Sequence, residues 1–375
     1  MRENFIDYGK ALLTIMVIAV HAGLAGMDSW SYVRMIFFFF VTGYTYTAGK
    51  RSLSAGITRR FTGIMLPFWK ILFITAFLDI ARAVYLGYGD YNMIKANIMF
   101  SVYLSGLVPK VLSFSNFFVY SVLHRAVHPA MPFSYPVITP LNCHLWFLVA
   151  MFSGCVLFFT YMEKLRRHKY YDIPAILIML FIASLESPRT IQLPVSLGRG
   201  CIACACMIAA VNAKEFNILS AKKFSNKIIA GLIAACVCAF AILNGANKCA
   251  FIMSIYGDGS FLSVLIVYIG GISASILILY LMQLLEHYWQ SPVLSFIGRN
   301  TMTLYLWNII LNTIFSILLL KIINRAPVMD AFDMSLFTPD SYALILITTA
   351  LTVITGTLMA RYKKSHSESI LAKII

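Results

Sequence analysis

Residues 10–21 have the sequence KALLTIMVIAVH, in which an uncharged run separates a lysine from a histidine. An apolar run of this kind is typical of a membrane-spanning helix. On an α-helix, Lys10 and His21 lie about 20° apart around the axis and about 16 Å apart along it, with Asp7 and Thr14 close to the same stripe. If Lys10 marks the inner boundary of the membrane, we expect His21 about halfway through the hydrocarbon layer.

The composition extends this prediction to the whole chain. Apolar residues make up 60% of the 375 residues and charged residues 12%, so we expect a polytopic protein with a single integral-membrane domain over residues 1–375. The net charge of +15 would suit a nucleic-acid partner only if the cations formed a compact basic face. They occur instead in short clusters between apolar spans. This pattern predicts that the protein contacts a lipid bilayer and does not bind nucleic acid.

Hydropathy predicts an all-α bundle of about ten transmembrane helices. Lys and Arg are concentrated in alternate loops, which places both termini in the cytoplasm. The connection over residues 82–142 is apolar enough for two more crossings, so twelve spans stay open. The expected spans are about 11–27, 33–49, 62–81, 143–162, 173–186, 196–212, 228–244, 261–285, 293–320 and 342–360.

Several other kinds of site have no support in the sequence. Cys201, Cys204 and Cys206 lie in an apolar run without a nearby histidine or acid, so we expect packing residues and no metal site. Nucleophile-elbow, Walker and zinc-protease motifs do not occur in the sequence. The N-terminal segment also resembles a cleavable signal peptide, but the charge pattern is complete with the first span in place, which favours an uncleaved helix.

An ionisable side chain inside a membrane is costly unless it faces the protein interior or a wet cavity, so His21 is a candidate functional residue. A neutral imidazole can take a proton from a hydroxyl and return it to a leaving group, as acyl transfer requires. The alternative is a histidine that only links helices by a hydrogen bond. The predicted spans contain one acid, Asp79, and five cations within them or at their edges, which favours an anionic ligand over a proton-driven pump. The cations are Arg34, Lys70, Arg82, Arg199 and Arg299.

The predicted cytoplasmic loop KRSLSAGITRRFTGIMLP (50–67) contains Arg59 and Arg60. Two guanidinium groups at a membrane mouth can hold phosphates in a bidentate manner. The alternative is that the pair only anchors the topology of the loop.

Five segments in order resemble the membrane acyltransferase type 3 family, and in particular its fucose 4-O-acetylase-like branch. They are FIDYGKALLTIMVIAVHAG (5–23), RMIFFFFVTGY (34–44), RRFTGIMLPFW (59–69), HLWFLVAMF (144–152) and SFIGRNTMTLYLWN (295–308). The resemblance implies transfer of an acyl group, usually acetyl from cytoplasmic acetyl-CoA, to a sugar hydroxyl of a cell-surface polysaccharide or its lipid-linked precursor. It also implies a bacterial inner or plasma membrane and no permanently bound cofactor.

The resemblance assigns roles to individual residues. It makes His21 the catalytic residue, as general base or as acyl carrier, and it places Lys10, Arg59 and Arg60 on the acyl-CoA donor. Lys10 stands where the family usually has arginine, which keeps the charge but loses the planar fork.

Other residues are expected to support the site. Arg34 is expected to stabilise an oxyanion. Asn308 stands where the family commonly has histidine, and we interpret it as a dispensable polar contact. His144 and Trp146 are expected on the acceptor side, where an interfacial aromatic belt is the alternative. The predicted supporting residues are Asp7, Arg34, Arg299, Tyr305 and Asn308.

Two other functions stay open at this point. Buried cations in a multi-span bundle also suit a transporter or exporter of a glycan or an acyl-bearing anion. The residues at Lys10 and Asn308 are compatible with a family member that has kept the fold and lost activity.

Overall fold

The computed structural model describes residues 4–24, 31–49, 52–85, 145–185, 194–219, 225–245, 260–323, 342–367 and 369. These residues form helices and no strand, as predicted for an all-α bundle. The helices are α1 (Asn4–His21), α2 (Ser31–Tyr44), α3 (Leu53–Arg60), α4 (Leu66–Tyr85), α7 (Trp146–Thr160), α8 (Asp172–Leu185), α9 (Leu197–Glu215), α10 (Asn226–Gly245), α11 (Phe261–Tyr288), α12 (Pro292–Arg299), α13 (Thr301–Ile322) and α14 (Tyr342–Ser365). Short π or 3₁₀ segments cover Phe61–Met65, Tyr161–Leu165, Lys169–Tyr171 and Pro194–Ser196.

Seven helical segments in the described part of the chain are long and apolar enough to cross a membrane, so the chain is a membrane protein, but the count of ten spans is not confirmed. The segments are Leu53–Leu78, Trp146–Leu165, Leu197–Glu215, Asn226–Leu243, Phe261–Tyr288, Thr301–Ile322 and Tyr342–Ser365. Two other predicted spans are short, since α2 and α8 have 14 residues each, against the roughly 20 that a perpendicular helix needs.

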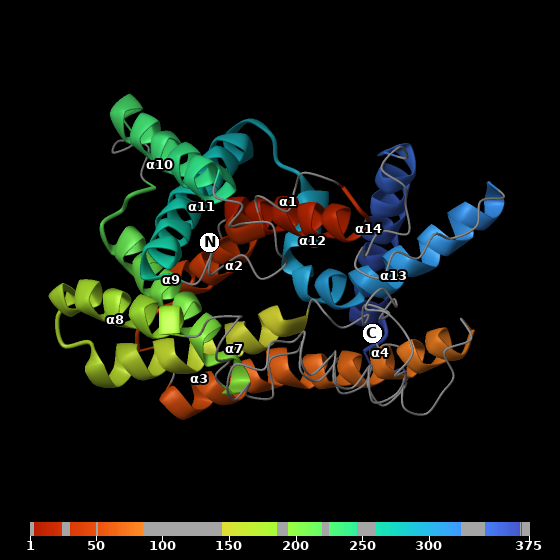
Figure 1. Ribbon diagram of the computed structural model, residues 1–375, viewed down its shortest axis with the longest axis horizontal. Helices are drawn as coiled ribbons and strands as arrows, with labels where there is room; N and C mark the ends of the chain where they lie inside the picture. Colours follow the sequence, from red (N-terminus) through yellow and green to blue (C-terminus); the bar gives the residue numbers. More distant parts are fainter. Residues whose placement is uncertain are drawn as a thin grey trace, which may run out of the picture.

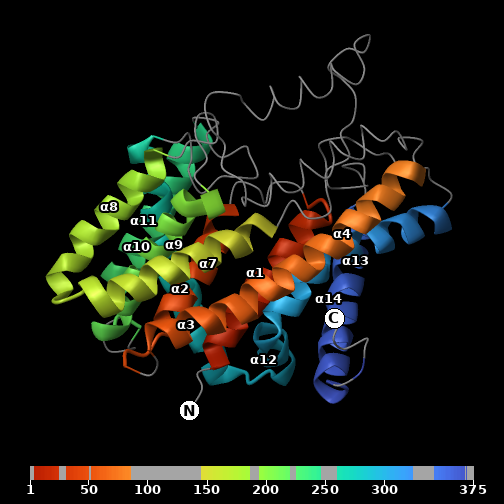
Figure 2. The ribbon, with the colours of Figure 1, turned by 90° about the horizontal axis from the view of Figure 1, so that it is seen from below.

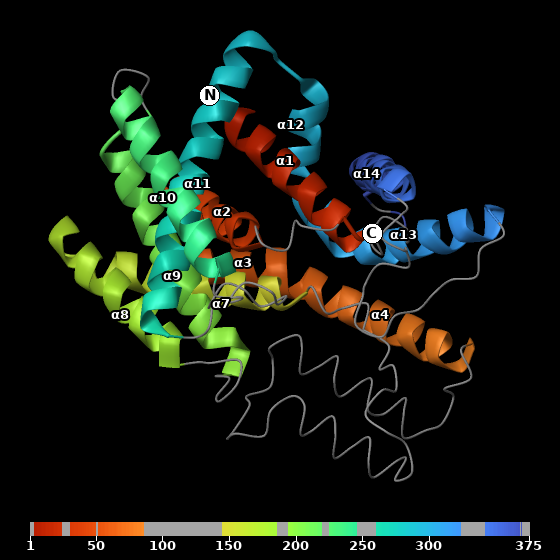
Figure 3. The ribbon, with the colours of Figure 1, turned by 45° about the horizontal axis from the view of Figure 1, so that its top comes forward.

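Helix α1 lies at the centre of the molecule. It packs against α2, α11, α12, α13 and α14, and Figure 1 shows it between the green helices and the blue C-terminal helices. Figure 3 shows the same arrangement from another side, with α12 alongside α1. Contacts between α1 and α12 and between α1 and α13 include a small apolar cluster of Ala11, Ile18, Ile297 and Leu304.

The predicted bounds of the first span, 11–27, are wrong. Helix α1 starts at Asn4 and ends at His21, because Gly23 at φ 100° forms a left-handed helix end. The Gly23 amide donates to the carbonyl of Val20 and the Leu24 amide to that of Ala19, which is the Schellman pattern. Hydropathy extends a span through such a glycine, whereas the backbone does not.

The predicted start of the third span, at residue 62, is also wrong. Arg59 and Arg60 lie on a helix and not in a loop, because Ser52 caps α3 and α3 continues through the π turn into α4. Pro67 in the first turn of α4 has no amide to donate, and the wider turn before it, where the Leu66 amide reaches the carbonyl of Phe61, accommodates this gap. Figure 1 shows α3 and α4 as one long orange rod.

The ninth predicted span, 293–320, is two helices. Ser291 caps α12 with Pro292 at its first position, and α12 ends at Asn300, from which α13 starts. A β-carbon on Gly298 would collide with the backbone of Asp7, so this glycine allows α12 to approach α1 closely. Hydropathy misses the break because both helices are apolar.

Several predicted basic loops do meet at shared helix ends. Lys214 at the end of α9 donates to the carbonyl of Tyr46 after α2. Arg166 after α7 forms ion pairs at 2.8 and 2.7 Å with Asp172 at the start of α8 and Glu215 at the end of α9. In Figure 2 the N-terminus and α12 also lie at one edge of the molecule. These contacts agree with a common side for the basic ends; its cytoplasmic location stays a prediction.

Candidate functional site

The side chain of His21 lies at the last helical position of α1 and is partly exposed. The glycine-terminated end described above fixes this position, since Gly23 allows the chain to leave the helix directly after it. Asp7 and Thr14 on the same stripe are both 1% exposed, as expected for a stripe that faces the protein interior. His21 is therefore at the end of a helix whose polar face is covered by other helices.

The closest polar partner of His21 is Asn308 of α13. Nδ1 of His21 and Oδ1 of Asn308 are 2.5 Å apart, although 287 positions separate the two residues. The Asn308 side chain is fully buried, and its Nδ2 donates to the backbone carbonyl of Tyr305. The structure thus brings together the predicted catalytic residue and two of the predicted supporting residues.

A second amide on α13 holds the end of α1. Nδ2 of Asn312 donates to the carbonyl of Ile18 at 3.0 Å, and its Oδ1 accepts a hydrogen bond from the Thr352 hydroxyl of α14 at 2.6 Å. Asn312 and Thr352 were not predicted as site residues. The signal was present, because an asparagine four residues after Asn308 lies on the same helix face.

The inner part of the α1 stripe is an ion cluster. Asp7 lies 3.2 Å from Nε of Arg299 and 3.8 Å from Nζ of Lys10. The Lys10 side chain is 23% exposed and that of Arg299 48%, whereas Asp7 is buried beneath them. One carboxylate thus lies between two cations at the contact of α1 with α12.

Arg34 lies in the first turns of α2 and is 4% exposed. Its positive charge acts on the imidazole of His21, so the two groups belong to one electrostatic environment. This is the setting in which a guanidinium group can stabilise negative charge that develops during a reaction.

A cluster of aromatic side chains connects α7 to α13 and α2. The ring of Phe147 lies 5.5 Å from Tyr305 and 5.1 Å from Phe39, measured between ring centroids. Trp146 is 5% exposed, and the guanidinium of Arg199 lies 4.8 Å above its ring. One face of Trp146 is therefore covered by a cation, so contact of this ring with an acceptor stays a prediction. His144 lies outside the described residues.

Arg59 and Arg60 lie on α3, which packs against α7. Arg59 is exposed and Arg60 partly exposed, and the charge of Arg60 acts on the buried thiol of Cys155. In the described residues α3 packs mainly against α7, whereas α1 packs mainly against α2, α11, α12, α13 and α14. The predicted donor residues thus lie on helices that have different main neighbours.

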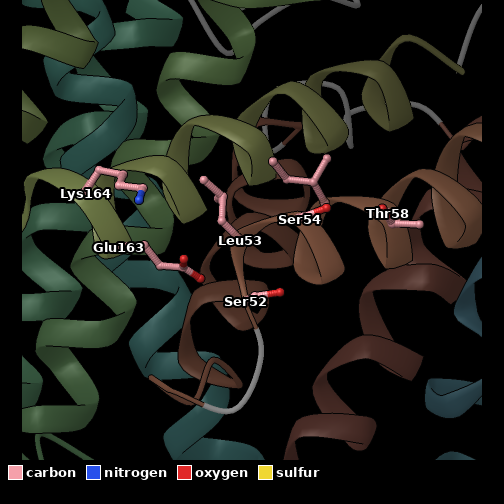
Figure 4. A pocket seen from close by; sticks show the side chains of 7 residues that line it. Ser52, Leu53, Ser54, Thr58, Glu163 and Lys164 are labelled. Atoms are coloured by element: carbon pink, nitrogen blue, oxygen red, sulfur yellow. The ribbon is translucent and has the colours of Figure 1, made fainter.

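A shallow depression of about 540 Å³ lies at the start of α3, shown in Figure 4. It does not include His21 or any other predicted site residue. Its surface combines one acid with one base and several hydroxyl groups, which gives it no clear charge preference. The lining residues are Ser52, Leu53, Ser54, Ile57, Thr58, Glu163 and Lys164.

The cysteines of α9 are packing residues, as predicted. Cys201, Cys204 and Cys206 are each at most 2% exposed. The described segments contain no group of three or more His, Cys, Asp or Glu residues arranged to hold a metal ion.

A family profile described as an acyltransferase domain matches residues 3–361, almost the entire chain. Neither the search of curated proteins nor the search of solved structures gives a match.

Proposed function

The chain belongs to the membrane acyltransferase type 3 family and is an acyltransferase by this membership. On that premise we propose that it is an O-acyltransferase. It moves an acyl group, usually acetyl, from cytoplasmic acyl-CoA to a sugar hydroxyl. We propose as acceptor a cell-surface polysaccharide or its lipid-linked precursor, and as location the inner or plasma membrane of a bacterial cell.

The observation that carries the proposal is the place of His21. It is a partly exposed imidazole at the end of a central helix, held at one nitrogen by Asn308 and within the field of Arg34. A general base needs a ring nitrogen that carries a lone pair, and a hydrogen bond at the other nitrogen holds the ring in place, as Asn308 does at Nδ1. A histidine that served only to link two helices would not need access from outside the bundle.

The reaction can follow either of two routes through His21. As a base, the imidazole takes the proton of the sugar hydroxyl while the hydroxyl oxygen attacks the thioester carbonyl. The C–S bond then breaks, and the CoA thiolate receives the proton from the imidazolium. As a carrier, the imidazole nitrogen attacks the thioester first, and CoA leaves as the thiolate, which produces an acylimidazolium. The sugar oxygen then takes the acyl group from nitrogen, and the hydroxyl proton goes to the CoA thiolate.

Each route develops negative charge on the carbonyl oxygen of the donor in the tetrahedral intermediate. Arg34 is our candidate for stabilising this oxyanion, because it is buried and its charge already acts on the His21 ring. The phosphates of CoA are proposed to bind Lys10, with Arg299 beside it, or the separate arginines Arg59 and Arg60.

The experiment that tests the function uses membrane vesicles with and without the protein, supplied with acetyl-labelled acetyl-CoA. We expect label in the glycan as an alkali-labile ester, and only when the protein is present. Label that enters the vesicle lumen without forming an ester would instead indicate a transporter. No transfer and no uptake with any acyl donor would indicate an inactive family member.

A further inference from the structure

The amide of Asn308 has only one orientation that satisfies its surroundings. One end of the amide faces the backbone carbonyl of Tyr305, which can only accept a hydrogen bond. The NH₂ group must therefore be on that side, and the carbonyl oxygen Oδ1 faces His21. Because Asn308 is fully buried, reversing the amide would leave two acceptors, Oδ1 and the Tyr305 carbonyl, in contact without a hydrogen between them.

This orientation determines where the proton of His21 lies. Oδ1 of an amide has no hydrogen to donate, so the nitrogen 2.5 Å away must be the donor. That nitrogen is Nδ1. In a neutral imidazole only one of the two nitrogens carries hydrogen, so Nε2 then carries a lone pair in place of a hydrogen.

We propose that Asn308 is a positioning residue that holds His21 in the Nδ1–H form, so that Nε2 is the nitrogen that reacts. This inference rests on the proposed function and specifies the reacting atom. In the base route, Nε2 takes the hydroxyl proton and later gives it to the CoA thiolate. In the carrier route, the lone pair of Nε2 forms the N–C bond as the C–S bond breaks, and Nδ1 keeps its hydrogen bond to Asn308 throughout.

Further hydrogen bonds join the same two helices close to this contact. One turn beyond Asn308 on α13, Asn312 binds the carbonyl of Ile18, which lies one turn before His21 on α1. Thr352 of α14 orients Asn312 in turn. Two neighbouring asparagines on α13 thus contact the last turn of α1, one at the backbone and one at the ring.

The inference differs from the interpretation of Asn308 as a dispensable contact. Asparagine cannot act as a base, but it does not need to, because its role is to accept the Nδ1 hydrogen. A carboxylate at this position would also accept and would keep the same form of the ring. An alanine would leave Nδ1 without its acceptor, and the proton would then be free to occupy Nε2 and block it.

The direct test is nitrogen NMR of the full chain in lipid nanodiscs, with ¹⁵N-labelled histidine and the pH set so that the ring is neutral. The His21 signals are identified by their loss in His21→Ala. We expect the wild type and Asn308→Asp to have hydrogen on Nδ1 and none on Nε2. We expect Asn308→Ala to shift a large part of the population to the Nε2–H form.

A matched control separates this effect from loosened packing. Asn312→Ala removes a similar amide one turn along the same helix and leaves Asn308 in place, so we expect the Nδ1–H form to persist. Hydrogen on Nε2 in the wild type, an unchanged ring in Asn308→Ala, or an equal shift in Asn312→Ala would each overturn the proposal. These results do not depend on acyl transfer, so they distinguish failure of this inference from failure of the proposed function.

The kinetic consequence is measured separately. We expect Asn308→Ala to lower the turnover number by at least about tenfold with little change in KM for acetyl-CoA, because the reacting nitrogen is blocked in part of the population. Asn308→Asp is expected to restore most of the lost rate. Full activity of Asn308→Ala would contradict a positioning role.

Discussion

His21 and Asn308 are hydrogen-bonded to each other at 2.5 Å, although they lie on the first helix and on α13, 287 positions apart in the chain. The contact joins His21, which carries the proposed chemistry, to Asn308, which cannot itself act as a base. It also makes the late part of the sequence a component of the site formed by α1. Predictions about the site therefore concern both ends of the chain.

The ion cluster around Asp7 predicts opposite effects of two substitutions on donor binding. If the phosphates of acetyl-CoA bind beside Lys10, Lys10→Ala removes a cation and raises KM for acetyl-CoA by about threefold to tenfold, which is about 1 kcal/mol. Asp7→Asn removes the competing carboxylate, so we expect a lower KM. Lys10→Arg should retain wild-type binding, because it keeps the charge.

Steady-state kinetics in detergent or nanodiscs over a range of acetyl-CoA concentrations measures these effects. The salt dependence of KM is a useful control, since an electrostatic contribution weakens as ionic strength rises. An equal KM for all three variants would place the donor phosphates elsewhere, with Arg59 and Arg60 as the next candidates.

Gly298 predicts a packing defect. A β-carbon at this position would collide with the backbone of Asp7, which cannot move aside as a flexible side chain can. Gly298→Ala should therefore push α12 away from α1 and lower the stability by about 1–3 kcal/mol, as overpacked sites usually do.

A thermal unfolding curve in detergent checks this prediction, with Gly231→Ala on α10 as the control. The space around Gly231 is open, so alanine there should leave the unfolding midpoint unchanged or raise it slightly through its higher helix propensity. A Gly298→Ala protein as stable as Gly231→Ala would argue against the close contact between α1 and α12.

Arg166 is predicted to hold three helix ends together. Its guanidinium binds the buried carboxylate of Asp172 and the carboxylate of Glu215, and the Tyr161 hydroxyl also donates to Asp172. The hydrogen bond to Glu215 raises the pKa of Arg166 above its already high range, so the group stays charged. Arg166→Met leaves Asp172 buried without its cation, and we expect a loss of about 3 kcal/mol.

The neighbouring exposed residue provides the control for this variant. Arg167→Met removes the same charge one position away and should change the unfolding midpoint little. Equal midpoints for the two variants would mean that Arg166 does not stabilise the packing of α7, α8 and α9.

Part of this structure can be predicted from the sequence because local patterns determine it. Helical periodicity places Asp7, Thr14 and His21 on one face of the first helix, and apolar runs locate most of the helices. The end of α1 is also a local feature, since Gly23 marks it, but a hydropathy window averages over that residue. The break at Asn300 and the π turn before Pro67 are missed for the same reason.

The partners of the site could not be predicted, because they depend on tertiary packing. No pattern in the sequence places Asn308 on His21 or Asn312 on the carbonyl of Ile18, since each pair joins distant helices. The same holds for Arg199, which covers the ring of Trp146 from another helix. The main neighbours of α1, which carries Lys10, and of α3, which carries Arg59 and Arg60, likewise depend on tertiary packing.

The measurement that tests the central claim most directly is acetyl transfer by His21→Ala compared with the wild type and His287→Ala, at equal abundance in the membrane. His287 is an exposed histidine at the end of α11 with no proposed role at the site. We predict that the wild type and His287→Ala transfer label at equal rates and that His21→Ala transfers none above background. Equal transfer by all three proteins would contradict the assignment of His21 as the reacting residue.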